Sequence, residues 1–428
     1  MAKKINSVLK EVSNKLELDR GRIKEIEDLT RRFLKELRDN IRKSGLDADA
    51  FVGGSLAKET MVKKDIYDID IFIRFGKKHS NNELSELTWK ILNKSGDLHI
   101  QRIHGSRDYF RIKISDDLVF EIIPVKKIRR PKEAENITDL SYSHVTYIKK
   151  RIKGTKIPNE IKLAKAFCYA NNCYGAESYI NGFSGYGLEL LIYNYKSFLK
   201  FMKAMVKVKE EKLVIDIEKH HKNKRNVLLD LNESKLQSPV ILVDPTYKTR
   251  NVLAALSKET FGKFQKACKN FLKNPRISAF EKKSVDIEKI KKNAERRGNE
   301  FILIEAKTNK QEGDIAGSKL KKFYEHLREE IGEYFDVKSN GFEYEKGKSA
   351  KFFFVVKRKK EVIAKGPLKS QEKHVKKFKR KHKSTFTKEG RLYSKKRFDF
   401  SGEEFFKNWK LRNLKKLKEM NITYLRIV

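Results

Sequence analysis

Residues 51–75 contain the feature that most constrains the fold, a glycine turn followed by a strand in which acidic and apolar residues alternate. The stretch reads FVGGSLAKETMVKKDIYDIDIFIRF. Successive side chains of a strand point to opposite faces, so Asp68 and Asp70 share one face, about 7 Å apart along the strand. Isoleucines occupy the other face. The alternation therefore predicts a strand with one buried apolar face and two carboxylates on the opposite face.

The carboxylate pair and the turn before it indicate phosphoryl chemistry. Neighbouring carboxylates repel unless a cation lies between them, and hard oxygen ligands suit Mg²⁺. Gly53 and Gly54 let the backbone approach a ligand closely, and Ser55 supplies a hydroxyl and an N–H. The segment 58–64 adds lysines. We interpret this as a phosphate-binding loop beside a metal site. A polar edge strand after an ordinary glycine turn is the alternative.

A third carboxylate lies in the apolar strand predicted over residues 118–124, LVFEIIP. A carboxylate among apolar residues is costly unless it is paired or bound to a metal. We therefore expect Glu121 on a strand next to Asp68 and Asp70, as a third metal ligand. A carboxylate at a sheet edge that meets a surface lysine is the alternative.

The charge of the chain predicts a polyanionic partner. The 428 residues include 98 Lys and Arg against 57 Asp and Glu, a net charge of +41 spread over the whole chain. This excess favours nucleic acid over a membrane surface. We found no apolar run of transmembrane length, no apolar signal core and no disulfide or zinc spacing among the cysteines. We expect a soluble cytoplasmic protein with no membrane partner.

Hydrophobic periodicity predicts the elements around this stretch. Before residue 140 it predicts two amphipathic helices over 5–45 and a third helix over 83–93. Two short strands are predicted over 99–103 and 109–114. After residue 140 it predicts a mainly helical region, with helices over 161–169 and from about Leu188, a strand over 238–245 and a further helix that Thr249 caps.

The C-terminal part of the sequence differs from the rest in its charge and in its predicted elements. A charged stretch near 273–300 predicts a domain boundary. A strand over 301–307, a helix over 315–335 and a hairpin over 342–358 predict a small α/β domain that contacts nucleic acid, with a plain α/β fold as the alternative. The basic run 372–384, EKHVKKFKRKHKS, is equally compatible with phosphate contact and with a solvated face.

A series of segments resembles the archaeal, class I CCA-adding enzymes, which are tRNA nucleotidyltransferases of the DNA polymerase beta superfamily. In chain order these are GGSLAKET, DIYDIDIF, FEIIPV, DLSYSH, CYGAESYINGFSGYGLELLIYNY and VDPTYKTRNVLAALS. They cover residues 50–260 closely, and GPL, the basic run and GRLYSKKR resemble the family's C-terminal end. The pairing of YGAE with GFSGY is the most specific feature, because it separates this group from poly(A) polymerases and 2′-5′ oligoadenylate synthases.

The resemblance implies a multidomain α+β fold. Its expected parts are a nucleotidyltransferase head with a mixed sheet and helices, a helical central domain, an α/β body and a basic tail, over residues 1–145, 146–275, 276–365 and 366–428. The last two parts are expected to bind the acceptor stem and T arm of tRNA. The oligomeric state stays open, a homodimer included.

The resemblance also implies site residues. It assigns two Mg²⁺ ions to Asp68, Asp70 and Glu121, although the family usually has Asp at the third position. Lys58 stands where the family has Arg, which keeps the charge and loses the bidentate fork. The residues implied in nucleotide binding are Gly54, Ser55, Lys58, His144, Lys165, Tyr174, Ser184 and Arg250. Of these, Arg250 is implied to read the base, and most of the others hold the triphosphate.

The implied function is template-independent addition of C, C and A to the 3′ end of tRNA from CTP and ATP, with release of pyrophosphate. Two alternatives share the catalytic head. One is an enzyme that synthesises poly(A) or oligo(A), which would incorporate ATP without prior CTP. The other is a catalytically weakened relative that binds tRNA.

Overall fold

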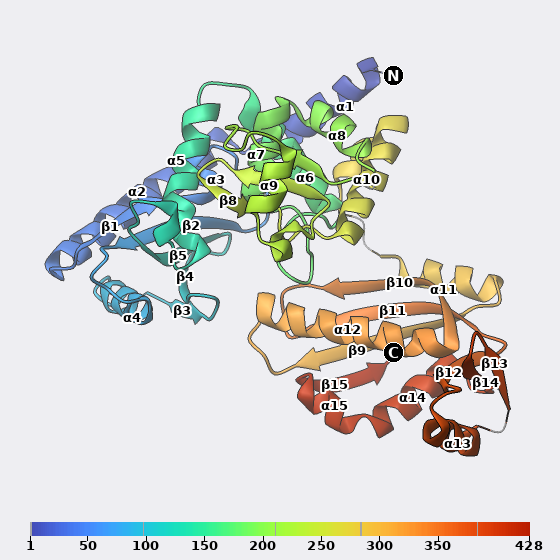
Figure 1. Ribbon diagram of the computed structural model, residues 1–428. Helices are drawn as coiled ribbons and strands as arrows, with labels where there is room; N and C mark the ends of the chain where they lie inside the picture. The colour runs from blue at the N-terminus through green and yellow to red at the C-terminus, as the bar shows by residue number, and fades with distance from the viewer. Residues whose placement is uncertain (1, 97, 210, 283–284, 383) are drawn as a thin grey trace. The chain divides into compact units, whose positions relative to one another are not determined.

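The computed structural model divides the chain into two compact units, Met1–Lys283 and Ser284–Val428 (Figure 1). It describes residues 2–96, 98–209, 211–282, 285–382 and 384–428. The α+β class is confirmed, since both units combine helices with sheets. The finer division into four domains stays a prediction. None of the helices within these ranges has the length and apolar character that crossing a bilayer requires.

The first unit begins with a mixed five-stranded sheet, which we call the head sheet. Its strand order is β1-β2-β5-β4-β3, and only the central pair β2 and β5 runs parallel. Its strands are β1 (Ala48–Val52), β2 (Tyr67–Phe75), β3 (Ile100–Ile103), β4 (Tyr109–Ser115) and β5 (Leu118–Lys126). The strands that periodicity predicted in this part are confirmed.

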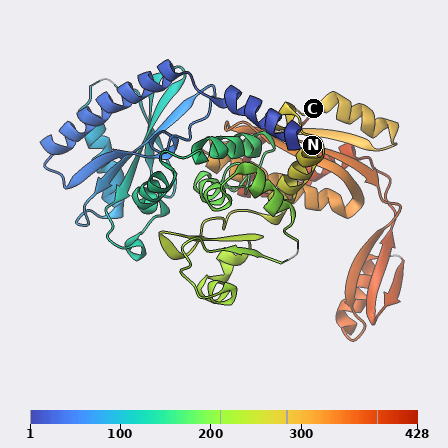
Figure 2. The same cartoon turned by 90° about the horizontal axis from the view of Figure 1, so that it is seen from above.

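One face of the head sheet is apolar and covered by helices. Helices α2 (Arg20–Lys43) and α4 (Asn81–Leu92) pack their apolar residues on the isoleucines of β2 and on β5 in one core. Figure 2 shows α2 running along the sheet. Asp19 caps α2 by accepting from the Arg22 N–H, and Ser80 and Glu83 form a capping box at α4. Because this face is buried, the opposite face of β2 carries the polar side chains.

The rest of the first unit is mainly helical, as predicted. Its large core joins residues of α1, α5, α6, α7, α8 and α10. The helices and 3₁₀ turns of the first unit not yet given are α1 (Ala2–Leu16), α3 (Gly54–Ala57), η1 (Pro131–Glu133), η2 (Ile137–Leu140), α5 (Ser141–Ile152), α6 (Ile157–Ala170), α7 (Gly185–Tyr195), α8 (Phe198–Val206), α9 (Lys224–Asp230), η3 (Glu233–Leu236), α10 (Lys258–Lys273) and η4 (Ile277–Phe280).

A small sheet corrects one prediction in this region. Its order is β6-β7-β8, with β6 (Leu213–Ile215), β7 (Val240–Asp244) and β8 (Tyr247–Asn251). The predicted helix with Thr249 as its cap is wrong, because Thr249 lies in β8, which pairs antiparallel with β7. The Asn251 side chain accepts from the N–H groups of Leu242 and Leu253 and so ties the hairpin to the next turn. The helix starts later, at Lys258, where Ser257 caps it.

The second unit holds two antiparallel sheets. The larger has the order β10-β11-β9-β15, and its core includes residues of α12 and α14. The smaller, β12-β14-β13, packs against α13 (Figure 2). The elements are α11 (Ile287–Arg296), β9 (Glu300–Thr308), α12 (Asp314–Tyr334), β10 (Phe335–Tyr344), β11 (Ser349–Arg358), β12 (Val362–Leu368), α13 (Glu372–Lys381), β13 (Thr385–Lys388), β14 (Arg391–Lys396), α14 (Gly402–Arg412), α15 (Leu414–Glu419) and β15 (Ile422–Ile427).

Candidate active site

The three predicted metal ligands lie on one face of two adjacent strands. On β2, Asp68 and Asp70 alternate with isoleucines that are completely buried. The parallel register places Asp70 directly opposite Glu121 of β5. Glu121 alternates with the buried Phe120 and Ile122, so it shares the carboxylate face. The predicted strand next to Asp68 and Asp70 is therefore present.

The glycine turn rests against the carboxylate strand. The Gly53 N–H donates to the Asp70 carbonyl oxygen at 2.8 Å. Gly54 has a φ of +57°, and a Cβ on it would lie 1.7 Å from Asp70 Oδ2. A Cβ on Gly53 would lie 2.3 Å from the Phe72 ring. Only glycine fits this contact, which holds the turn and Ser55 beside the carboxylates.

Two cations also contact the carboxylates. Lys64 Nζ lies 2.7 Å from Asp68 Oδ2, and Arg111 bridges Asp68 Oδ1 at 3.4 Å and Glu121 Oε1 at 3.1 Å. Burial raises the pKa of Asp70, Lys58 lowers it and Asp68 raises it again, with a net increase. In the described ranges, no three His, Cys, Asp or Glu side chains are close enough to hold a metal ion together. The oxygen donors themselves suit Mg²⁺, with Lys64 and Arg111 as competing cations.

A buried carboxylate that our sequence analysis missed joins two predicted nucleotide-binding lysines. Glu189 of α7 accepts from Lys58 Nζ at 2.7 Å and from Lys165 Nζ of α6 at 3.0 Å. Lys165 also donates to Thr60 Oγ1 at 2.9 Å. Burial disfavours the charged form of Glu189, but the two ammonium groups outweigh it and lower the pKa. All of these side chains are buried. A lone carboxylate in the apolar run GYGLELLIYNY was the available signal.

Tyr174 and Ser184 lie at the start of α7. A Cβ on Gly185 would lie 3.1 Å from the Tyr174 hydroxyl oxygen, which places that hydroxyl at the helix N-terminus. Burial and then the Glu189 carboxylate raise the pKa of Tyr174. The Ser184 hydroxyl accepts from the Gly187 N–H at 3.1 Å and caps α7. In this structure Ser184 therefore orients the helix that carries Glu189.

His144 and Arg250 meet at a second buried carboxylate, Asp244, which our sequence analysis also missed. His144 Nε2 lies 3.0 Å and Arg250 Nη1 lies 2.6 Å from Asp244 Oδ2. Asp244 Oδ1 accepts from the Tyr186 hydroxyl at 3.2 Å and from the Thr246 N–H and hydroxyl, both at 2.8 Å. The His144 ring stacks on Tyr186, with centroids 4.0 Å apart. Asp244 thus connects α5, α7 and β8.

Asp244→Asn is expected to destabilise the first unit by about 3 kcal/mol, because it removes the buried carboxylate that pairs with Arg250 and accepts from Tyr186 and Thr246. Burial opposes the charged form of Asp244, but His144 and the other donors lower its pKa well below the usual value. The carboxylate therefore stabilises the fold above its unfolded pKa of about 3.9, and this contribution is lost as pH falls toward the folded pKa. Urea unfolding from pH 2 to 7 should show that the free energy of unfolding falls less steeply toward acid pH in the variant than in the wild type. An equally steep fall in both would contradict this.

Comparison with known proteins decides the family. Residues 31–151 match the family described as "Nucleotidyltransferase domain", and residues 159–281 match "tRNA nucleotidyltransferase, second domain". The chain is 44% identical to the CCA-adding enzyme of Nanoarchaeum equitans over 213 residues, which is 50% of this chain and 52% of that relative. It is 31% identical to the CCA-adding enzyme of Methanocaldococcus jannaschii over 310 residues, 70% of this chain and 66% of that relative.

The chain belongs to the tRNA nucleotidyltransferase family that includes these archaeal enzymes. It spans about half to two thirds of the length of the curated relatives it matches. The Cid1 poly(U) polymerase, solved with Mg and 3′-dATP bound, is 13% identical with a TM-score of 0.51, over 66% of this chain and 100% of that chain. This likeness shows that the matched part of the chain shares its fold with Cid1, and no more.

Proposed function

We propose that the chain adds C, C and A to the 3′ end of tRNA from CTP and ATP, acts in the cytoplasm, and releases pyrophosphate. The observation that supports this best is the contact of Gly54 with Asp70, because it sets a phosphate-binding turn beside a pair of carboxylates. The relatives named CCA-adding enzymes support the choice of substrates. The test is incorporation of each nucleotide into a tRNA that lacks its 3′ CCA.

The proposed reaction is an in-line attack of the primer 3′-hydroxyl on the α-phosphorus of CTP or ATP. Asp68, Asp70 and Glu121 would hold two Mg²⁺ ions, which when bound lower the pKa of the hydroxyl and neutralise charge on the leaving group. The triphosphate would be oriented by hydrogen bonds and charge from the turn and the buried cluster, which fix its geometry for attack. The residues proposed for this are Ser55, Lys58, His144, Lys165 and Tyr174.

Base choice is assigned to Arg250. A guanidinium carries only donors, so it pairs with the ring acceptors that cytosine and adenine present. Guanine and uracil present N–H donors at some of these edges and would leave them unpaired. In the described residues, Arg250 donates to Asp244 from Nη1. This ion pair orients the planar guanidinium and so its other N–H groups.

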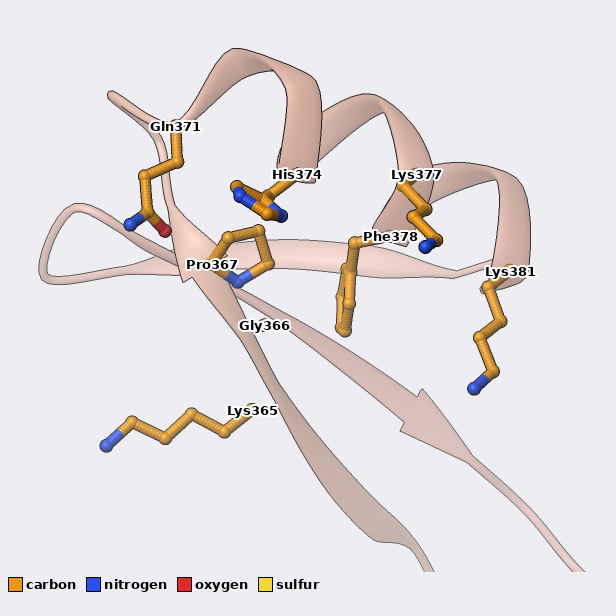
Figure 3. A pocket seen from close by; sticks show the side chains of 8 residues that line it. All are labelled: Lys365, Gly366, Pro367, Gln371, His374, Lys377, Phe378 and Lys381. Carbon is orange, nitrogen blue, oxygen red and sulfur yellow. The ribbon is translucent and has the colours of Figure 1, made fainter.

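The second unit is proposed to bind the acceptor stem and T arm of tRNA through phosphates. A hollow of about 420 Å³ lies between α13 and β12 (Figure 3). Gly366, Pro367 and Phe378 contribute to its lining. The polar part of the lining comes from three lysines, Lys365, Lys377 and Lys381, together with Gln371 and His374. Lysines around an apolar floor fit a ribose-phosphate backbone, which is recognised by shape and charge.

Replacing Lys377 and Lys381 together with alanine is expected to weaken tRNA binding by similar factors for all tRNAs. If each lysine contacts one phosphate, the slope of log K against log salt should fall in magnitude by about 2. Titrations at several salt concentrations measure this slope. The control removes two exposed lysines of α10, Lys266 and Lys269, and should leave the slope close to wild type. Equal slopes for the wild type and the α13 variant would contradict the assignment.

A further inference from the structure

Glu189 joins three segments that are distant in sequence. It projects from α7 and is 1% exposed, and it contacts Lys58 after the glycine turn and Lys165 of α6. Thr60 Oγ1 lies 3.4 Å from Glu189 Oε1 and accepts from Lys165. The carboxylate oxygens are divided between the lysines, since Oε2 faces Lys58 and Oε1 faces Lys165.

The cluster holds more lysine N–H donors than the Glu189 carboxylate takes up. Two ammonium groups share the Glu189 carboxylate, and both lysines also act on the buried Asp70 carboxyl. Each ammonium has three N–H donors. Within the described ranges, Lys58 uses one donor and Lys165 uses two, so N–H groups remain for an anion. A buried ion pair with only a structural role would have partners for its donors.

The two lysines lie near the carboxylate strand. Lys58 and Lys165 both act on the Asp70 carboxyl, and Glu189 and Lys58 both act on the Tyr174 hydroxyl. The same turn residues that contact Asp70 lead directly into Lys58 through α3. An anion lying against the glycine turn would therefore meet the free N–H groups of these two lysines.

We propose that Glu189 is a positioning residue that holds Lys58 and Lys165 as one unit for the triphosphate of the incoming nucleotide. The carboxylate holds both buried ammonium groups in one place and leaves N–H donors on them for the phosphates. This role deepens the proposed function and rests on it for the identity of the nucleotide.

The test is CTP binding to the full chain by calorimetry, in Mg²⁺ and without RNA. Glu189→Gln keeps the shape and removes the charge, so the two ammonium groups lose their shared counterion and are no longer held together. CTP should bind at least tenfold more weakly, while affinity for a tRNA lacking CCA stays within twofold. CTP affinity equal to wild type overturns the proposal, as does an equal loss of tRNA affinity.

A double-mutant cycle separates positioning from general damage and does not require Glu189→Gln to fold. Lys58→Met and Lys165→Met are made singly and together. If the lysines act as one unit, the double variant should bind CTP within about threefold of the weaker single variant. Losses that multiply overturn the proposal. A wild-type chain that binds CTP but does not add it to tRNA overturns the proposed function alone, and one that binds no CTP overturns both.

Discussion

Asp70→Ala is expected to abolish nucleotide incorporation while tRNA affinity stays within a few fold of wild type. Asp70 lies opposite Glu121 in the central parallel pair and beside Asp68, so its removal takes one carboxylate from the proposed metal site. A bound metal ion contributes several kcal/mol to transition-state stabilisation, which corresponds to a loss on the order of a thousandfold. Single-turnover incorporation and filter binding on the same preparation measure the two quantities.

The matched control is Asp65→Ala, an exposed aspartate just before the same strand, which should incorporate within twofold of wild type. It removes the same charge without touching the carboxylate face. Incorporation by the Asp70 variant near the control level would show that Asp70 does not hold the metal.

Gly54→Ala is expected to reduce incorporation by at least a hundredfold and to destabilise the first unit by about 2–4 kcal/mol. The added Cβ would lie 1.7 Å from Asp70 Oδ2, so either the turn or the carboxylate must move. Overpacking typically costs about 1–3 kcal/mol, and a side chain in the left-handed region adds about 1 kcal/mol. A displacement of about 1 Å at a reacting centre costs about a hundredfold in rate. Denaturant unfolding and initial rates test both effects.

Gly262→Ala provides the control for the added methyl group. Gly262 lies in helix α10, its φ is not positive, and an added Cβ meets no atom within 4 Å. Alanine in a helix is favoured over glycine by about 1 kcal/mol, so this variant should be slightly more stable and fully active. If Gly54→Ala behaved like Gly262→Ala, the turn would not be fixed against Asp70.

The carboxylate face of β2 and of β5 was predictable because it depends only on the alternation of side chains. Asp68 and Asp70 share a face in any strand, and an apolar neighbourhood around Glu121 requires a sheet interior. The strand followed from this alternation, and helix α7 followed from the apolar residues that come after the glycines.

The partners of these residues were not predictable from local pattern. Glu189 meets Lys58 from 131 residues away, and His144 meets Asp244 across 100 residues. Periodicity also predicted a helix at Thr249, where pairing with β7 imposes a strand instead. The same reasoning that selected Glu121, a costly carboxylate in an apolar run, applies to Glu189 and would have selected it. Arg111, which pairs with Asp68 and Glu121, carries no comparable signal.

The measurement that tests the central claim most directly is incorporation into a tRNA transcript that ends before its CCA. Labelled CTP, ATP, GTP and UTP are supplied singly and in combination, with Mg²⁺ or with EDTA. We predict two additions from CTP alone, one addition from ATP only after these two, and no incorporation with EDTA. Tailing from ATP alone, or tRNA binding with no incorporation in any mixture, would contradict the proposed function.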